Sequence, residues 1–97
     1  MSQVIEEAVA ALNAKMDGRG FDAGTAKFDV EGEGTIMIDE AGARAGDEPA
    51  DVTMIADADT FREILEGDLN PTSAFMSGRL KVEGDMGKAM ALGSALS

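Results

Sequence analysis

The sequence predicts a single α+β domain in which helices cover one face of a β-sheet. Three observations lead to this prediction. Residues 3–16 carry apolar side chains at helical spacing, and residues 26–39 contain two alternating runs joined by a glycine-rich turn. Residues 67–96 contain the start and end signals of two more helices around a short strand. At 97 residues the chain can bury one hydrophobic core, so we assign residues 1–97 to one domain.

The N-terminal helix is expected over residues 3–16. Ser2 can cap it, and Glu6 and Glu7 stand early in it, where the helix dipole favours negative charge. The run Asp17-Gly18-Arg19-Gly20 ends it. One face of this helix is apolar and consists of Ile5, Ala8, Val9, Leu12 and Met16.

Two strands joined by a tight turn are expected next. Ala26, Phe28 and Val30 alternate with charged residues, and Ile36 and Ile38 alternate with Thr35, Met37 and Asp39. The turn between the runs is Gly32-Glu33-Gly34, so together they predict a β-hairpin.

Two more strands should follow the hairpin. Residues 43–47 predict a weak third strand, because glycine and alanine contribute little to a sheet. Val52, Met54 and Ala56 form the inward face of a fourth strand. Ile55 on its other face indicates that the sheet is covered on both sides.

A short helix should begin after residue 59. Thr60 and Glu63 have the spacing of a capping box, in which each side chain accepts a hydrogen bond from the other residue's backbone N–H. Gly67 ends this helix, since glycine takes a positive φ without a Cβ clash. Its buried positions are expected to be Phe61, Ile64 and Leu65.

The chain then contains a helix, a strand and a helix in quick succession. Asn70-Pro71 starts the first of these helices and Gly78 stops it. Residues 79–83 alternate as a half-buried strand does, with Leu80 and Val82 on one face and Lys81 and Glu83 on the other. Gly84-Asp85 starts the last helix, whose small and apolar stripe is Met86, Ala89, Met90 and Gly93.

Composition excludes several classes of function. The net charge of −11 repels phosphate backbones, so no nucleic-acid partner is expected. The chain has no cysteine and no histidine, which excludes disulfides and thiolate metal sites. No apolar run is long enough for a membrane span, and the N-terminus lacks the regions of a signal peptide. We therefore expect an acidic cytoplasmic protein.

The negative charge is uneven along the chain. Residues 1–70 carry seventeen acids against five bases, whereas residues 71–97 carry two acids against three bases. Helical packing alone could explain this, because it leaves little room for charge. The alternative is that residues 71–97 make transient contact with a membrane or an anionic head group, through Arg79, Lys81 and Lys88.

Catalytic and metal sites are not expected. Asp51, Asp57 and Asp59 do not follow the spacing of a calcium loop, and capping explains them better. No pair stands out among the nineteen acids, and the hydroxyl residues lack an activating base. Gly32-x-Gly34 matches no phosphate loop, and no cofactor is expected.

The seven methionines outnumber the four phenylalanines. Methionine is flexible and fills irregular gaps, so it suits either an ordinary core or a site for apolar ligands of varied shape. Small residues such as Gly87, Ala89 and Gly93 recur in the last helix. They leave room for a tight helix contact or for a ligand.

The stretch from 67 to 92 resembles the sterol carrier protein 2 (SCP2) family. The residues that carry the resemblance are Gly67, Asn70-Pro71, Ala74-Phe75, Gly78, Leu80-Lys81, Gly84, Met86-Gly87, Ala89-Met90 and Leu92. They follow one another without a gap, and a looser resemblance extends back to the N-terminus. The resemblance implies a five-stranded mixed sheet under helices, with an apolar tunnel between the sheet and the C-terminal helices.

The resemblance also implies a function, which is non-catalytic binding, and transfer, of a lipid with a long apolar part. Fatty acid, acyl-CoA, phospholipid and isoprenoid all fit. The alternative is an interaction module of lipid metabolism that uses the same apolar groove for a partner protein. The residues expected to contact lipid are Phe75, Met76, Leu80, Val82, Met86 and Met90.

Overall fold

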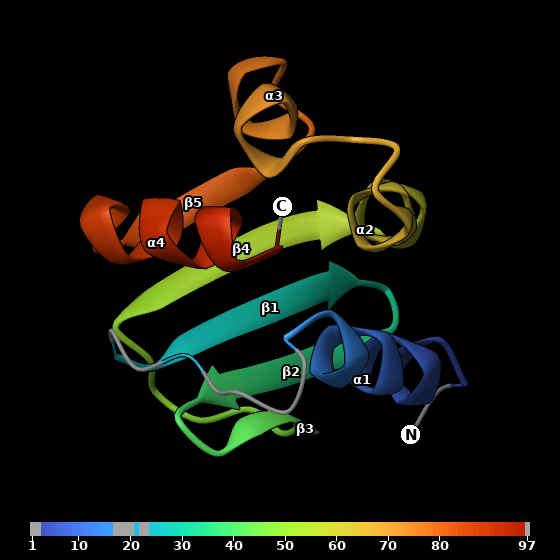
Figure 1. Cartoon of the computed structure of the whole chain (residues 1–97), viewed down its shortest axis with the longest axis vertical. Coiled ribbons are helices and arrows are strands. Elements are labelled where there is room, and N and C mark those ends of the chain that lie inside the picture. The colour runs from blue at the N-terminus through green and yellow to red at the C-terminus, as the bar shows by residue number, and fades with distance from the viewer. Residues whose placement is uncertain (1–2, 17–20, 22–23, 97) are drawn as a thin grey trace.

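A five-stranded sheet forms the base of the fold, and helices lie on one of its faces (Figure 1). The computed structural model describes residues 3–16, 21 and 24–96. Its elements, in chain order, are α1 (Gln3–Lys15), β1 (Ala26–Glu31), β2 (Gly34–Asp39), β3 (Gly42–Ala45), β4 (Val52–Asp57), α2 (Ala58–Glu66), α3 (Pro71–Met76), β5 (Lys81–Gly84) and α4 (Met86–Leu96). The predicted α+β class is confirmed.

The sheet is mixed, with the strand order β3-β2-β1-β4-β5. β1 and β4 are parallel, and the other neighbouring strands are antiparallel. The register places Phe28 beside Ile36 on one side and beside Met54 on the other, and Met54 beside Val82. Alternation along each strand therefore sends one continuous set of apolar side chains towards the helices.

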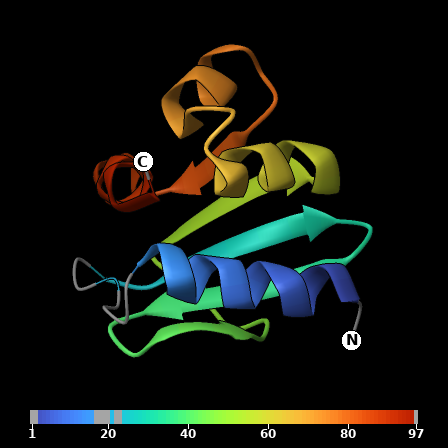
Figure 2. The same cartoon turned by 45° about the vertical axis from the view of Figure 1, so that its right-hand side comes forward.

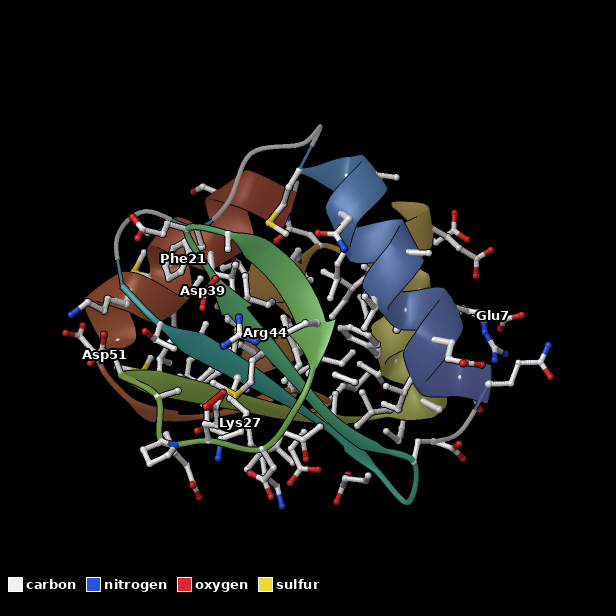
Figure 3. All side chains as sticks on the ribbon, turned by 90° about the horizontal axis from the view of Figure 1, so that it is seen from below. Glu7, Phe21, Lys27, Asp39, Arg44 and Asp51 are labelled. Atoms are coloured by element: carbon white, nitrogen blue, oxygen red, sulfur yellow. The ribbon has the colours of Figure 1, made fainter. Side chains whose placement is uncertain are left out.

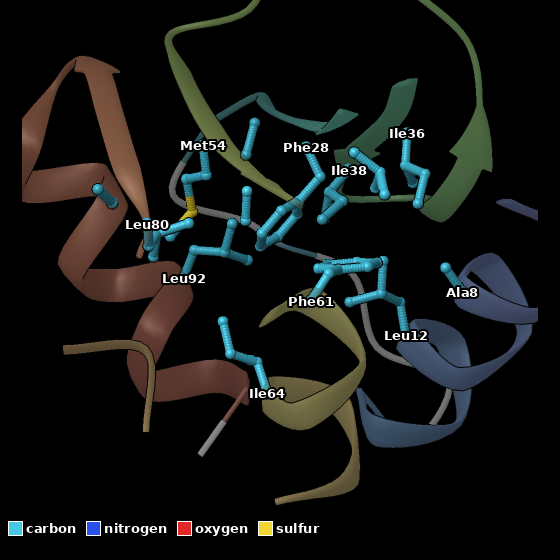
Figure 4. Packing of buried hydrophobic residues seen from close by; sticks show 14 of the residues in the cluster. Ala8, Leu12, Phe28, Ile36, Ile38, Met54, Phe61, Ile64, Leu80 and Leu92 are labelled. Carbon is cyan, nitrogen blue, oxygen red and sulfur yellow. The ribbon is translucent and has the colours of Figure 1, made fainter. Parts of the chain in front are cut away.

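The core lies between this face and the helices α1, α2 and α4. The rings of Phe28 in β1 and Phe61 in α2 pack with their centroids 4.6 Å apart at a 48° tilt. Leu12 of α1, Ile64 of α2 and Leu92 of α4 are buried in the same cluster (Figure 4). Figure 2 shows α1 and α2 lying side by side over the sheet.

Sequence features at the helix ends act largely as expected. Asn70 caps α3, its side-chain oxygen accepting from the N–H groups of Thr72 and Ser73 at 2.8 and 3.3 Å. Gly67 ends α2 with φ of 83°. Asp85 accepts from the N–H of Lys88 at 3.1 Å in the first turn of α4. Ser2 and residues 17–20, to which capping and helix termination were assigned, lie outside the described residues.

The capping box predicted for Thr60 and Glu63 is wrong. α2 begins at Ala58, and its N-cap is Asp57, whose carboxylate accepts from the N–H of Thr60 at 2.7 Å. Thr60 is buried inside the helix. Asp57 is the last residue of β4 and is a strong cap itself, so the strand passes directly into the helix.

Two strand boundaries also differ from those predicted. β3 is Gly42–Ala45 where residues 43–47 were expected, and β5 is Lys81–Gly84 where residues 79–83 were expected. The second shift arises because the N–H groups of Arg79 and Leu80 bond to the Ala74 carbonyl, at 2.9 and 3.1 Å. They close the end of α3 and are not available to a sheet partner.

The outer face of the sheet is polar but partly covered. On this face Lys27 pairs with Asp47 at 3.0 Å and Arg44 pairs with Asp39 at 2.7 Å. Figure 3 labels Lys27, Arg44 and Asp39 in a view from the β3 edge of the sheet. Met37, expected on the polar side, is only 1% exposed. The connection from β3 to β4 covers it, and the N–H of Glu48 lies 3.4 Å from the Met37 sulfur. Ile55 on this face is half-buried, so some cover exists here as predicted.

We expect Asp57→Ala to destabilise the fold in a pH-dependent way. Hydrogen bonds from the backbone and side chain of Thr60, with Arg79 nearby, hold the pKa of Asp57 below its ordinary value of 3.8. A carboxyl whose folded pKa is lowered stabilises the fold above the unfolded pKa and loses that contribution as the pH falls through the folded pKa. The stability difference between wild type and Asp57→Ala should therefore shrink as the pH falls below 3.8.

Denaturant unfolding at a series of pH values measures this difference. Asp68→Ala is the matched control, because Asp68 is an exposed acid just beyond the same helix. A difference for Asp57→Ala that stays constant across the acidic range would show that the carboxylate charge contributes nothing at the cap.

Candidate functional site

An apolar groove with a volume of about 250 Å³ lies between α3, β5 and α4. β4 contributes Met54 to its floor. Its lining residues are Met54, Pro71, Thr72, Phe75, Met76, Leu80, Val82, Met86, Ala89, Met90 and Gly93. No charged side chain appears among these lining residues, within the part of the chain that the structure describes.

Local sequence signals place the walls of the groove. Asn70 and Pro71 start α3 at a position that turns Phe75 and Met76 towards α4. Leu80 and Val82 alternate inward, and Val82 lies beside Met54 across the β4–β5 pair. Gly84 has φ of 98°, and a Cβ built there would lie 2.5 Å from the Asp51 carbonyl oxygen, so glycine is needed to hold β5 against β4.

The stripe of α4 forms the opposite wall. Met86, Ala89, Met90 and Gly93 all line the groove, as their spacing on one helical face predicts. Gly93 lies where α4 approaches α3, and a Cβ built at this position would make an ordinary van der Waals contact of 3.7 Å with the Cβ of Pro71. The small side chains of this stripe leave open space in the groove.

The groove has a buried floor and an exposed rim. Met54 and Leu80 are each 2% exposed and Ala89 is 5% exposed, whereas Met76 is 81% and Met90 is 69% exposed. Phe75 and Met86 are exposed by 41% and 44%. Apolar side chains gathered in this way around a hollow are typical of a surface that meets a ligand, a membrane or another protein. The site is an open groove where the resemblance implied a tunnel.

All six residues expected to contact lipid lie on this groove. They are Phe75, Met76, Leu80, Val82, Met86 and Met90. Five further residues line the groove that were not among the six expected to contact lipid: Met54, Pro71, Thr72, Ala89 and Gly93. The stripe of α4 could have indicated Ala89 and Gly93, but nothing local relates Met54, on a strand far along the chain, to this site.

The three cations of residues 71–97 do not form a patch. Arg79 is hydrogen-bonded to Glu63. The Nζ atom of Lys88 lies 3.7 Å from Oδ2 of Asp51 and 3.6 Å from Oδ2 of Asp85. Lys81 is exposed and lies beside Ile55 in register, on the face of the sheet opposite Val82.

The acids considered as a metal site have other partners. Asp51 accepts from the N–H of Thr25 at 3.1 Å, Asp57 caps α2, and Asp59 lies 3.9 Å from Arg62. Among the described residues there is no group of three side chains placed to hold a metal ion.

A second, smaller hollow of about 180 Å³ lies between α1 and α2. Its floor includes Ala8 and Phe61, and Glu7, Arg62 and Glu66 stand on its edge. No sequence pattern predicted this hollow. Because α1 presents alanines here, the two helices do not fill the space between them.

The groove is therefore suited to apolar contact and little else. Among the described residues, the one lining side chain that could donate a hydrogen bond is the Thr72 hydroxyl. The described lining contains no acid, base or thiol that could transfer a proton or attack a substrate. No helix among the described residues has the length and apolar character needed to cross a membrane.

Known proteins share this fold. SCP2-L2 of Aedes aegypti superposes with a TM-score of 0.77 at 17% identity, covering 94% of each chain. The structure of Aedes aegypti SCP-2 in complex with palmitate superposes with a TM-score of 0.76 at 18% identity, covering 100% of this chain and 97% of that one. At these identities the likeness shows the fold alone.

Sequence relatives lead to the same family. Hydroxysteroid dehydrogenase-like protein 2 of Danio rerio is 43% identical over 77 residues, and sterol carrier protein 2 of Rattus norvegicus is 40% identical over 80 residues. These matches cover 71% and 80% of this chain but only 19% and 13% of the relatives. Residues 4–97 match the SCP-2 sterol transfer family. The chain belongs to the SCP-2 sterol transfer family.

Proposed function

We propose that the groove binds a lipid with a long apolar part, non-covalently and without catalysis, and that residues 1–97 act as one lipid-binding domain. The observation that carries this proposal is the exposed apolar rim around a buried apolar floor. The family's description as sterol transfer proteins supports it, as does the palmitate bound in a structure of the same fold. Transfer of lipid and a cytoplasmic location are part of the same proposal.

The driving force would be removal of lipid methylene groups from water, worth about 0.8 kcal/mol each before ordering costs. The groove volume of about 250 Å³ is below the roughly 300–1,000 Å³ of sites that enclose a drug-sized ligand. A long chain would thus be held over part of its length unless the walls move. Met76, Met86 and Met90 are unbranched and exposed, so they can reposition around the rest of it.

Phe75, Met76, Leu80, Val82, Met86 and Met90 are the residues that we expect to touch the lipid. Leu80 and Val82 would lie under the chain, on the strand side of the groove. The three methionines and Phe75 would close over it from α3 and α4.

The alternative function is an interaction module whose groove accepts an apolar segment of a partner protein. The same exposed rim favours it, because such a rim suits a partner helix as well as a lipid. The two functions differ in their response to added lipid. A lipid binder gains stability as RT ln(1 + [L]/Kd), whereas an interaction module gains none.

Native mass spectrometry of freshly purified protein, with an organic extract analysed beside it, tests the proposal. We expect an adduct of lipid mass that reappears in the extract. A clean unliganded mass, together with no thermal shift from fatty acids, acyl-CoA or isoprenoids, would favour the interaction module.

Met90→Glu should weaken lipid binding by roughly tenfold or more, because the bound chain would bury a carboxylate. Since Met90 is 69% exposed, its effect on the free energy of unfolding should stay within about 0.5 kcal/mol. Displacement of a fluorescent lipid and thermal unfolding measure the two quantities.

Ala91→Glu is the matched control for Met90→Glu. Ala91 is exposed on the same helix, next to Met90, and does not line the groove. Equal losses of affinity in the two variants would place the bound lipid elsewhere on the molecule.

We also propose that residues 71–97 make the transient membrane contact through the apolar rim and not through the three cations. Arg79 and Lys88 already have acidic partners, and Lys81 lies on the other face of the sheet. Met76 and Met90 are the most exposed large apolar side chains of the rim. They could enter the head-group region while a lipid enters or leaves the groove.

Sedimentation with phosphatidylcholine vesicles checks this contact. Met76→Glu should reduce the bound fraction several-fold, and combined reversal of Arg79, Lys81 and Lys88 to Glu should change it little. The opposite pattern, with binding lost on charge reversal and restored by anionic lipid, would assign the contact to the cations.

A further inference from the structure

On the basis of the proposed function, we infer that this groove selects lipids whose head group carries no negative charge. We expect a long-chain alcohol or an uncharged isoprenoid to bind more tightly than a fatty acid anion or an acyl-CoA with a chain of the same length. Three features support this inference: the lining of the groove, the state of the nearby cations, and the charge of the rest of the surface.

Among the residues that the structure describes, the lining has no charged side chain that would hold an anion. Its polar side chain is the hydroxyl of Thr72, at the exposed edge of the groove. The Thr72 backbone N–H already donates to the Asn70 side chain at 2.8 Å, and the Ser73 N–H donates to the same oxygen. The hydroxyl can accept or donate one bond to an alcohol or carbonyl head group, which is enough to orient an uncharged lipid.

Two described cations that adjoin lining residues in the sequence are already matched by acids. Arg79 precedes Leu80 and is hydrogen-bonded to Glu63; its pKa is raised by that bond and by the charges of Glu63, Asp57 and Asp59. Lys88 precedes Ala89 and lies within 4 Å of both Asp51 and Asp85.

The remaining cation of this stretch does not reach the groove either. Lys81 lies on the opposite face of the sheet, beside Ile55. A carboxylate or phosphate at the mouth of the groove would have to displace an acidic partner from Arg79 or Lys88 before it gained a counter-charge.

The rest of the surface adds a long-range penalty. The chain carries a net charge of −11, and residues 1–70 carry twelve more acids than bases. Such a charge produces a negative potential of a few kT, which opposes the approach of an anion and is screened by salt. A neutral head group is not repelled by this potential, and it does not need to break an ion pair when it binds.

Three ligands with a chain of palmitate length test the inference. Hexadecanol is neutral, palmitate is ionised at about pH 8, and palmitoyl-CoA carries several phosphate charges. Each displaces an uncharged fluorescent lipid from the full chain, below its own aggregation concentration, at low and high salt. We expect hexadecanol to bind tightest at low salt, with about a threefold to tenfold loss for each head-group charge. Added salt should reduce the differences in affinity between the three ligands.

A pair of variants on α3 separates two effects on lipid affinity, that of a charge inside the groove and that of the net charge of the protein. Thr72→Lys places an ammonium group on the lining and should raise the affinity for palmitate to that for hexadecanol or above. Ser73→Lys adds the same charge on an exposed neighbour that does not line the groove, and should have a much smaller effect.

Two results would overturn the inference, and they are distinct. Palmitate or palmitoyl-CoA binding at least as tightly as hexadecanol, with an affinity that falls as salt rises, would show that a cation of this chain holds the head group while lipid binding stands. Binding by none of the three ligands would remove the proposed function itself.

Discussion

The parallel pairing of β1 with β4 is the constraint on which the rest of the structure depends. It places Phe28 beside Met54 and brings the helix that follows β4 over the same strands, where Phe61 packs on Phe28. β5 then pairs with the free edge of β4, and α4 folds back over both. Without this pairing the C-terminal elements would have no apolar surface to cover, and the groove between α3, β5 and α4 would have no floor.

Local signals in the sequence were enough to predict the order of the helices and strands. The predicted helix starts at Asn70-Pro71 and Asp85 and the predicted helix end at Gly67 are found in the structure. A cap or a helix end depends only on a few neighbouring residues, so it can be predicted locally. The six residues expected to contact lipid fall within one short stretch of chain, but they lie on different helices and a strand, and the family resemblance assigned them to one site. The resemblance also implied a five-stranded mixed sheet, whereas the strand order was not predicted, because no local pattern contains it.

The errors at Met37 and Met54 arise from contacts between separate segments of the chain, which leave no local trace in the sequence, whereas the error at Thr60 has a local cause. Met37 alternates as an outward residue and yet is buried, because the connection from β3 to β4 happens to cross it. Thr60 has the spacing of a capping residue but lies inside the helix, because the preceding strand ends on an acid that caps better. Met54 belongs to the groove only through its register with Val82.

The side chain of Asn13 on α1 contacts the backbone of the edge strand β3, where another copy of the molecule could add a strand. It donates to the Ala43 carbonyl at 3.0 Å and accepts from the Ala43 N–H at 2.9 Å, so it occupies both backbone groups at the middle of the edge strand β3. An open edge is a template on which another chain can add a strand. One amide on α1 thus occupies the two backbone groups that Ala43 would otherwise offer to an added strand at this edge.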